Sequence, residues 1–562
     1  MNVSQLLAQC LENEKVAYIF GLPGEEIIPL VDALNDTSIR FILVRSEEAA
    51  AFMADMYGRI TGKAGFCLAT LGPGAINLLL GVADAHTDSA PLVALSAQVG
   101  LGRIYKETHQ VVDLVSMFKP VTKWADTLLT PGAVPEMLRH AFNLAQSERP
   151  GAVYLALPQD VASMPAAPSL RPLRVHPVHV AAPDPEQIAR AAAVLNAAQT
   201  PIILAGHGAA RHQAQAALIH FAEKLRMPVA TTFHGKGVFP DDHPYALGTM
   251  GFMVHDYVNF GFDQADVIVS VGYELQEFAP ARINPQADKK IIHLHRTAAV
   301  VDAFYNVTVD VAGDIPAALD ALAAQVSPRP GLVAAEQKIR CLLREELEQG
   351  RHDASYPLKP QRLVADTRAA LGREDFVLVD SGAVKMWMAR LYPTYRPNTC
   401  LVSNGLSTMG FAVPGALGVK LARPQQKVLA VTGDGGFLMN SGEIETALRE
   451  KISFVILIWV DGSYGLIKWK MKMQLGRFSH VDFGNPDFVQ YAESFGAQGY
   501  FIREAAELLP TLHQALSQDT VSVIACPVEY SENTKLTEKL EHLADPSKIK
   551  CPDNDKMSVP ER

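Results

Sequence analysis

Two aspartates stand directly after strand-like segments in the last third of the chain. The apolar segment KVLAV leads into TGDGG, which holds Asp434 among Gly433, Gly435 and Gly436, and the next apolar segment, FVILIWV, ends at Asp461. The acids are 461 − 434 = 27 positions apart, and each follows a strand, at the edge where open α/β sheets bind ligands. Carboxylate oxygens suit Mg²⁺, and glycines let the backbone approach a phosphate. The spacing therefore predicts a site for a metal-bound diphosphate.

A third strand-like segment, DFVLV, runs into the turn DSGAVKMW. Gly382, Ala383 and Val384 in this turn can present backbone N–H groups at a helix start, where anions bind. Each feature also has an ordinary interpretation, since GDGG is typical of a tight turn and Asp461 of a helix cap. Two acids that follow neighbouring strands favour the metal site.

The GDGG motif, its spacing to DGSYG and the apolar strand between them resemble the cofactor motif of thiamine-diphosphate-dependent decarboxylases and acetolactate synthases. The resemblance implies that the side chains of Asp434 and Asp461 and the carbonyl of Ser463 bind Mg²⁺. Most of the family has Asn at the position of Asp461, and the FAD-independent, catabolic-type acetolactate synthases, which this chain resembles most, share the departure. The implied cofactor contacts also include Tyr464, Gly465 and Leu466.

The segment SNGLSTMGFAVPGA is similar to the family stretch that supports the two cofactor rings. By this resemblance Met409 lies beneath the cofactor and props its rings into a bent form. The Ser407 carbonyl is then expected near the pyrimidine amine. Without the resemblance, Met409 would be predicted to fill the core.

A candidate catalytic acid lies near the N-terminus, in FILVRSEEAAAFMADMYGRITGKAG. This segment resembles the one whose glutamate hydrogen-bonds the aminopyrimidine ring, which implies that Glu47 activates the cofactor by protonating that ring. Ser46 before two acids is equally typical of an ordinary capped helix start. In relatives the pyrimidine pocket is also lined at the positions of Pro23, Thr70 and Asn77.

The segment KETHQVVDLVSMFKPVTKW resembles the acetolactate synthase stretch whose glutamine faces the substrate, here Gln110. The leading hypothesis is decarboxylation of a 2-oxo acid followed by carboligation, with two pyruvates giving 2-acetolactate and CO₂. One alternative is a non-oxidative decarboxylase that releases an aldehyde, although pyruvate decarboxylases carry a His-His pair where this chain has Thr108 and His109. Another is a catalytically silent, cofactor-binding regulatory subunit.

Two segments of the central region bear on flavin binding. FAD-binding acetolactate synthases typically carry Gly-Met-His-Gly and Asp-Asp-Arg segments, whereas this chain has GTMGFM (248–253) and GYELQEF (272–278). We therefore expect no FAD.

Three α/β domains must position these residues. Apolar strand-like runs alternate with helical stretches, which predicts doubly wound parallel sheets. The resemblance gives a pyrimidine-binding domain at 1–165, a central Rossmann-like domain at 185–325 and a diphosphate-binding domain at 359–535. A polar, Pro-containing tail follows at 545–562.

Composition limits the partners. The formal net charge of -10 argues against nucleic-acid binding, and no stretch approaches twenty uncharged apolar residues, so we expect no membrane span. The six cysteines form no CxxC pair, which favours reduced thiols and a cytoplasmic location. Because relatives build each site between two subunits, we expect a homodimer or homotetramer that acts on a small 2-oxo acid.

Overall fold

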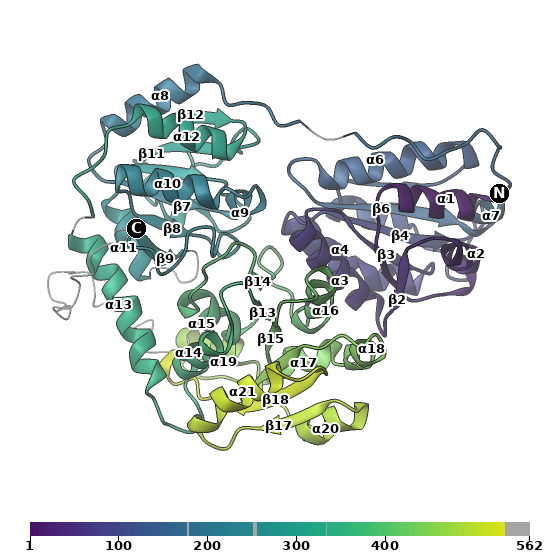
Figure 1. Ribbon diagram of the computed structural model, residues 1–562. Coiled ribbons are helices and arrows are strands. Elements are labelled where there is room, and N and C mark those ends of the chain that lie inside the picture. Colours follow the sequence, from purple (N-terminus) through teal and green to yellow (C-terminus); the bar gives the residue numbers. More distant parts are fainter. Residues whose placement is uncertain (177–178, 251–255, 333, 534–562) are drawn as a thin grey trace.

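The computed structural model describes residues 1–176, 179–250, 256–332 and 334–533. Within them the chain forms three six-stranded sheets whose paired strands run parallel, with helices interleaved between the strands (Figure 1). This confirms the predicted α/β class with three parallel-sheet domains. The predicted polar tail at 545–562 lies outside the described residues.

Each sheet lies within one of the three predicted sequence ranges. The N-terminal sheet contains β1 (Tyr18–Gly21), β2 (Arg40–Leu43), β3 (Gly65–Ala69), β4 (Leu92–Gln98), β5 (Trp124–Thr127) and β6 (Ala152–Pro158). The central sheet contains β7 (Pro201–Ala205), β8 (Val229–Thr231), β9 (Ala246–Thr249), β10 (Val267–Val271), β11 (Lys290–His295) and β12 (Val307–Ala312). The C-terminal sheet contains β13 (Phe376–Val379), β14 (Cys400–Val402), β15 (Val428–Gly433), β16 (Val455–Val460), β17 (Gln498–Phe501) and β18 (Ser522–Pro527).

The outer two domains share one topology. Their strand orders are β2-β1-β3-β4-β6-β5 and β14-β13-β15-β16-β18-β17, so the two sheets are built in the same sequence of crossovers. The central order, β12-β11-β10-β7-β8-β9, is that of a dinucleotide-binding Rossmann sheet. Central strands such as β4 and β6 are buried along their whole length, as expected where helices cover both faces of a parallel sheet.

Each of the three domains also contains its own set of helices. The N-terminal domain contains α1 (Val3–Asn13), α2 (Ile28–Ala33), α3 (Glu47–Thr61), α4 (Pro73–Thr87), α5 (Leu114–Phe118), α6 (Val134–Gln146) and α7 (Gln159–Ser163). The central domain contains α8 (Pro185–Asn196), α9 (His207–Arg211), α10 (Gln215–Leu225), α11 (Tyr257–Gln264) and α12 (Ile315–Gln325), and α13 (Ala334–Arg351) leads out of it. The C-terminal domain contains α14 (Pro360–Ala370), α15 (Ala383–Leu391), α16 (Ala412–Ala422), α17 (Asp434–Asn440), α18 (Glu443–Arg449), α19 (Gly465–Leu475), α20 (Phe488–Phe495) and α21 (Leu508–Leu516).

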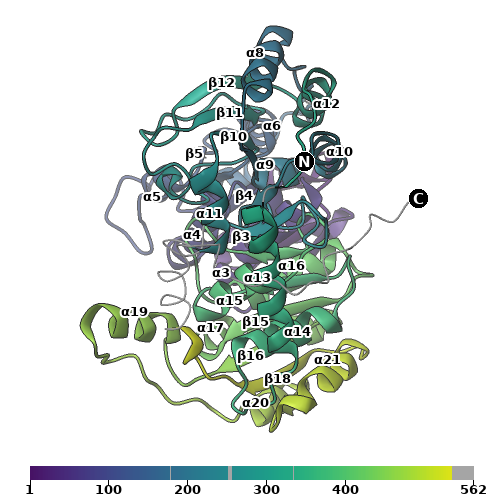
Figure 2. The same cartoon turned by 90° about the vertical axis from the view of Figure 1, so that its left-hand side faces the viewer.

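The N-terminal and C-terminal domains pack together through α3 and α16. A Cβ added at Gly418 of α16 would lie 2.3 Å from the carbonyl oxygen of Met53 in α3, so only glycine permits this approach. Phe52 and Phe411 meet beside it with ring centroids 6.4 Å apart. One apolar core therefore spans both domains, and it fixes how they sit against each other within one chain (Figure 2).

Candidate active site

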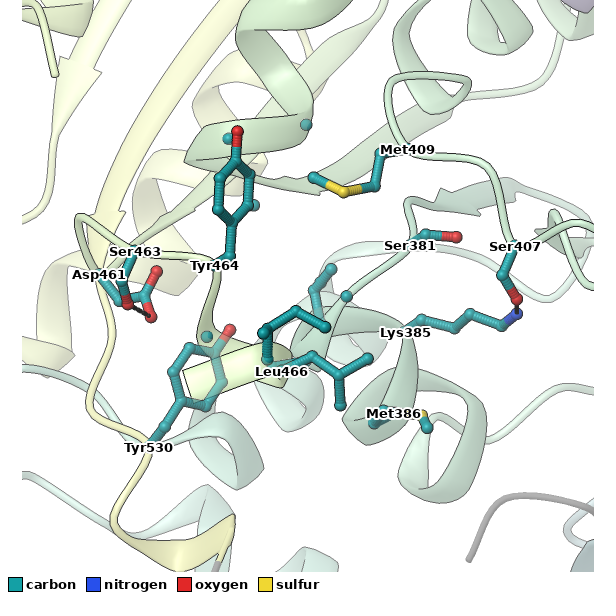
Figure 3. A pocket seen from close by; sticks show the side chains of 18 of the residues that line it. Ser381, Lys385, Met386, Ser407, Met409, Asp461, Ser463, Tyr464, Leu466 and Tyr530 are labelled. Atoms are coloured by element: carbon teal, nitrogen blue, oxygen red, sulfur yellow. Dashed lines mark hydrogen bonds between the residues drawn. The ribbon is translucent and has the colours of Figure 1, made fainter. Parts of the chain in front are cut away.

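A cavity of about 440 Å³ opens at the carboxyl ends of β13, β15 and β16. Figure 3 shows several of its side chains, among them Met409, Asp461, Ser463, Tyr464 and Leu466. All fourteen cofactor-binding residues predicted in the C-terminal domain line it: Gly382, Ala383, Val384, Ser407, Met409, Gly433, Asp434, Gly435, Gly436, Asp461, Ser463, Tyr464, Gly465 and Leu466. The strand ends therefore lead to this cavity, while the cofactor role of its residues stays a prediction.

Three helices start at the wall of this cavity. Helix α15 follows Gly382, α17 follows Gly433 and α19 follows Tyr464, and none of these three preceding residues caps its helix with a side chain. At the start of α17, Asp434 Oδ1 accepts the Gly435 N–H at 2.9 Å. An uncapped helix start offers unsatisfied backbone N–H groups and carries a partial positive charge. Such a convergence fits a diphosphate.

Two glycines leave room for this ligand. Gly382 has a φ of +130°, and a Cβ added there or at Gly433 would meet nothing within 4 Å. Such open backbone lets a phosphate lie directly against the N–H groups. In contrast, a Cβ at Gly435 would lie 2.9 Å from the Tyr464 ring, so this glycine is required for packing.

The two predicted metal-binding aspartates meet at one edge of the cavity. Asp434 Oδ2 accepts hydrogen bonds from the backbone N–H groups of Asp461 at 3.1 Å and Gly462 at 2.8 Å. Asp461 Oδ2 accepts one from Ser463 Oγ at 2.9 Å, and the Ser463 carbonyl accepts one from Gly465 N at 2.9 Å. Burial and the neighbouring Asp434 raise the pKa of Asp461 to about 6. A buried carboxylate and a half-buried one this close are stabilised by a cation, so the donor set fits Mg²⁺.

Asn485 completes this edge, and the sequence argument did not identify it. Its Nδ2 donates to Asp434 Oδ2 at 2.8 Å, while its buried Oδ1 has no hydrogen-bond partner. A hard oxygen that lies beside the aspartates without a hydrogen-bond partner also fits a metal site. No spacing signal could have found Asn485, because it reaches the site from a loop 51 positions after Asp434.

Lys385 is a second site residue that the sequence argument missed. It lines the cavity on the first turn of α15 and is 5 % exposed. Its Nζ donates to the Ser403 carbonyl at 2.6 Å and to Ser407 Oγ at 2.8 Å, as Figure 3 shows for Ser407. Burial lowers its pKa to about 8. Lys385 therefore links the α15 turn to the loop that carries Met409.

The central domain forms one wall of the cavity, through Phe233, Glu277, Phe278 and Arg282. Glu277 is almost fully buried, and burial together with Glu274 raises its pKa to about 8. Its carboxylate accepts hydrogen bonds from the backbone N–H of His207 at 3.1 Å and from Thr232 Oγ1. The strand-end pattern of the C-terminal domain could not indicate this wall, because its residues follow strands of another sheet. Residues 251–253 of the GTMGFM segment lie outside the described residues.

The predicted pyrimidine side forms a separate cluster in the N-terminal domain. Glu47, the first residue of α3, is 6 % exposed, and its Oε2 accepts a hydrogen bond from Asn77 Nδ2 at 3.0 Å. A Cβ at Gly74 would lie 3.2 Å from Glu47 Oε1. Ser46 precedes the helix but makes no capping bond with its side chain. Instead, Glu443 of α18 accepts the backbone N–H groups of Arg45 and Ser46.

Thr70, Pro23 and Gln110 surround this cluster. Thr70 Oγ1 donates to Glu26 Oε2 at 2.6 Å, and a Cβ at Gly24 would lie 2.3 Å from Thr70 Cβ. Pro23 and Gln110 are exposed. Gln110 has a φ of +57°, and its carbonyl would lie 2.9 Å from a Cβ added at Gly72. Such backbone strain in a non-glycine residue is typical of functional positions.

The two groups of predicted residues do not meet in this chain. Among the described residues that line the cavity, none comes from the N-terminal domain. Asn77 and Gln110 are exposed. Within one chain the two groups of predicted residues are therefore separate.

Helix α19 contributes an apolar edge to the cavity. Leu466 and Ile467 line it, Trp469 is buried beneath the helix, and Lys470 is exposed. Lys470 belongs to the solvated helix face, and Lys468 pairs with Asp482 at 2.8 Å. Among the described residues, none of the helices combines the length and apolar composition needed to cross a bilayer.

The sequence matches known proteins along most of its length. Residues 1–117, 188–322 and 380–526 match the N-terminal TPP binding domain, the central domain and the C-terminal TPP binding domain of thiamine pyrophosphate enzymes. A catabolic acetolactate synthase of Raoultella terrigena is 37% identical over 546 residues, covering 96% of this chain and 97% of that protein. The acetolactate synthase of Bacillus subtilis (strain 168) is 34% identical, with 95% and 94% covered. A probable acetolactate synthase large subunit of Methanocaldococcus jannaschii is 34% identical, with 99% and 98% covered.

Proposed function

This chain belongs to the thiamine pyrophosphate enzyme family, and from that premise we propose that it is an acetolactate synthase, which joins two pyruvate molecules to 2-acetolactate and releases CO₂. The observation that carries the proposal is the cavity where two carboxylates and three uncapped helix starts meet. It lies in a chain that is 34% and 37% identical to two acetolactate synthases over nearly its whole length.

The C-terminal domain would hold the cofactor by its diphosphate. Asp434, Asp461 and the Ser463 carbonyl would bind Mg²⁺, and the starts of α15, α17 and α19 would bind the phosphate oxygens. Met409, which lines the same cavity, would support the two rings. When bound, thiamine diphosphate supplies the carbon nucleophile and the ring that accepts the electrons released with CO₂.

Glu47 would hold the proton that cofactor activation requires. Its hydrogen bond to Asn77 uses Oε2, and Oε1, on the side of Gly74, would exchange a proton with the pyrimidine ring nitrogen. A carboxyl group that is 6 % exposed is shielded from bulk water, so its hydrogen bonds are stronger than in solvent. Gln110 would orient the pyruvate carbonyl.

Access of water would decide between carboligation and release of an aldehyde. Phe233, Phe278, Leu466 and Ile467 line the cavity with apolar surface, which would exclude solvent as a proton source and favour a second 2-oxo acid as the acceptor. This favours carboligation over release of an aldehyde.

A second copy of the chain would complete each site. The Glu47 cluster and the metal cavity lie apart within one chain, and exposed apolar residues flank both. Ile76 and Leu80 of α4 are 41% and 43% exposed, and Leu438 and Met439 of α17 are 37% and 50% exposed. Apolar surface beside two half-sites fits burial against a partner, in a homodimer or a dimer of such dimers.

The proposal includes no FAD. In a Rossmann sheet of this strand order the turn after β7 is where a dinucleotide's phosphates bind. Here a Cβ at Gly206 would lie 2.6 Å from Glu277 Oε1, so a carboxylate fills the space beside that turn. A yellow protein whose flavin survives gel filtration would contradict this part. The cytoplasmic location stays a prediction, to be tested by fractionating the source cells.

Product analysis tests the central proposal. Purified protein is supplied with pyruvate, thiamine diphosphate and Mg²⁺, and acetolactate, measured as acetoin after acid treatment, is resolved from acetaldehyde. We expect acetolactate to dominate. Aldehydes as the main products, from pyruvate or longer 2-oxo acids, would instead identify a decarboxylase, and no CO₂ from any 2-oxo acid would identify a silent relative.

A further inference from the structure

The loop of residues 403–410, here called the Met409 loop, carries Ser407 and Met409 to the cavity wall. Ser407 has a φ of +53° and Gly410 a φ of +82°. A serine in the left-handed region is strained, and surrounding contacts must hold it there. Those contacts come from all three domains, and four of them come from Asp84 and Asp88 at the end of α4 in the N-terminal domain.

Asp84 of α4 holds both ends of the loop. It is fully buried, and its Oδ1 accepts hydrogen bonds from Ser403 Oγ at 2.6 Å and from Thr408 Oγ1 at 2.7 Å. Its Oδ2 is buried without a hydrogen-bond partner. An Asn side chain could therefore keep both hydrogen bonds, whereas Ala would lose them.

Asp88, which follows α4, holds the loop backbone with both carboxylate oxygens. Oδ2 accepts Asn404 N at 2.9 Å and Arg59 Nη2 at 2.7 Å. Oδ1 accepts Gly405 N at 2.6 Å and lies 3.1 Å from His234 Nε2. Burial opposes ionisation, but His234 and Arg59 hold the pKa of Asp88 well below its ordinary value. Because both oxygens face donors, an Asn amide at this position would turn its NH₂ group against two of them.

The same helix also touches the other half-site. Asn77, near the start of α4, donates to Glu47, and Asp88 stands 88 − 77 = 11 positions later, which is about 16 Å along a helix. One rigid element therefore contacts the catalytic acid at one end and the Met409 loop at the other.

We infer that Asp84 and Asp88 are positioning residues for the Met409 loop, so that each N-terminal domain serves two active sites. The domain contributes Glu47 to the cavity of the partner subunit, and through Asp84 and Asp88 it shapes the cavity of its own chain. The inference rests on the proposed function for the arrangement of Glu47 between subunits, but the contacts of Asp84 and Asp88 lie within one chain.

Cofactor binding by single variants is the first test. The dissociation constant for thiamine diphosphate is measured by quenching of tryptophan fluorescence at fixed Mg²⁺, well below the melting temperature of each variant. We expect Asp88→Asn to raise it about tenfold to hundredfold, because hydrogen bonds to a charged group are lost and buried donors are left unpaired. Asp84→Ala should raise it as well, and Asp84→Asn should recover most of that loss. Asn is isosteric with Asp, so a role of Asp88 in packing alone would leave the dissociation constant of Asp88→Asn unchanged.

Hybrid dimers then test which site Asp88 serves. Two differently tagged chains are co-expressed and purified over both tags, and acetolactate formation is titrated with thiamine diphosphate. When one chain carries Glu47→Gln and the other Asp88→Asn, both changes fall on the same site, and the second site is intact. We expect about half the wild-type activity at wild-type cofactor affinity. When one chain carries both changes and the other none, each site carries one change, and the residual activity should show the raised dissociation constant of Asp88→Asn.

The opposite pattern would overturn the inference. If the hybrid with both changes in one chain keeps half the activity at wild-type cofactor affinity, Asp88 acts on the partner's site, and equal cofactor affinity in the two hybrids would also contradict the assignment. Unchanged cofactor affinity in Asp88→Asn would show that the loop is held without it. A wild-type protein that binds the cofactor but makes no acetolactate would refute the proposed function alone, because the binding test of Asp84 and Asp88 needs no turnover.

Discussion

Replacing Gly465 by alanine should separate metal binding from folding. Gly465 is the first residue of α19, and a Cβ added there would lie 2.7 Å from Asp461 Oδ2. An ordinary contact needs about 3.4 Å, so the carboxylate must move by roughly 0.7 Å. Metal–ligand distances hold within about 0.2 Å. The methyl group therefore displaces Asp461 from any Mg²⁺ that it binds together with Asp434.

The expected loss of Mg²⁺ affinity follows from the displacement of one ligand. Changes that misplace a metal ligand weaken metal affinity by about 10- to 100-fold, which corresponds to about 1.4 to 2.7 kcal/mol. Stability should respond differently, because alanine in a helix is favoured over glycine by about 0.5 to 1 kcal/mol. Displacing the Asp461 side chain costs free energy and offsets part of that gain. We expect the metal-free protein's free energy of unfolding to change by less than about 1 kcal/mol.

The assay titrates Mg²⁺ at saturating thiamine diphosphate, with the melting temperature of metal-free protein measured alongside. Gly132→Ala is the matched control, since a Cβ at Gly132 would meet nothing within 4 Å and the residue lies in the N-terminal domain. Unchanged Mg²⁺ affinity in Gly465→Ala, or the same loss in the control, would refute the assignment of Asp461 as a ligand.

Four further changes test other parts of the site and the proposed subunit interface. Glu47→Gln should abolish acetolactate formation while thiamine diphosphate still binds, and Asp434→Ala should abolish that binding; wild-type turnover in either would contradict its role. Burial lowers the pKa of Lys385 to about 8, whereas an unfolded lysine titrates near about 10.4. The unfolded chain therefore binds more protons than the folded chain between these two pKa values. The free energy of unfolding should rise with pH in this range by at most about 1.4 kcal/mol per pH unit, relative to Lys385→Met. Urea unfolding at several pH values measures this slope. Leu80→Asp should dissociate the dimer and reduce activity at low protein concentration; a variant that sediments as wild type would refute the interface at α4.

The sequence could predict the C-terminal half-site because its residues are local to strand ends. Asp434 and Asp461 each follow a run of apolar residues that can only be a buried strand, and the order of a parallel sheet brings the carboxyl ends of neighbouring strands together. The pairing of β15 with β16 then places the two acids side by side. No long-range information is required beyond that rule.

The rest of the site could not be predicted in the same way. Phe233 and Glu277 reach the cavity from the central sheet, and their positions depend on how two domains pack. Asn485 arrives from a loop without a periodic pattern. Lys385 lies within the motif DSGAVKMW, yet nothing in its spacing indicates that its charge is buried against Ser403 and Ser407.

The packing of the outer domains explains why the predicted residues form two clusters. Both domains have the same strand order, and within one chain they share a core through α3 and α16, where Gly418 permits close approach to Met53. That contact fixes Glu443 of α18 against the start of α3, where it accepts the N–H groups of Arg45 and Ser46. The C-terminal domain of the same chain thus braces the helix that carries Glu47, while no described residue of the N-terminal domain lines the cavity at Asp434. Under the proposed function, a site that uses both Glu47 and Asp434 would therefore draw them from two chains.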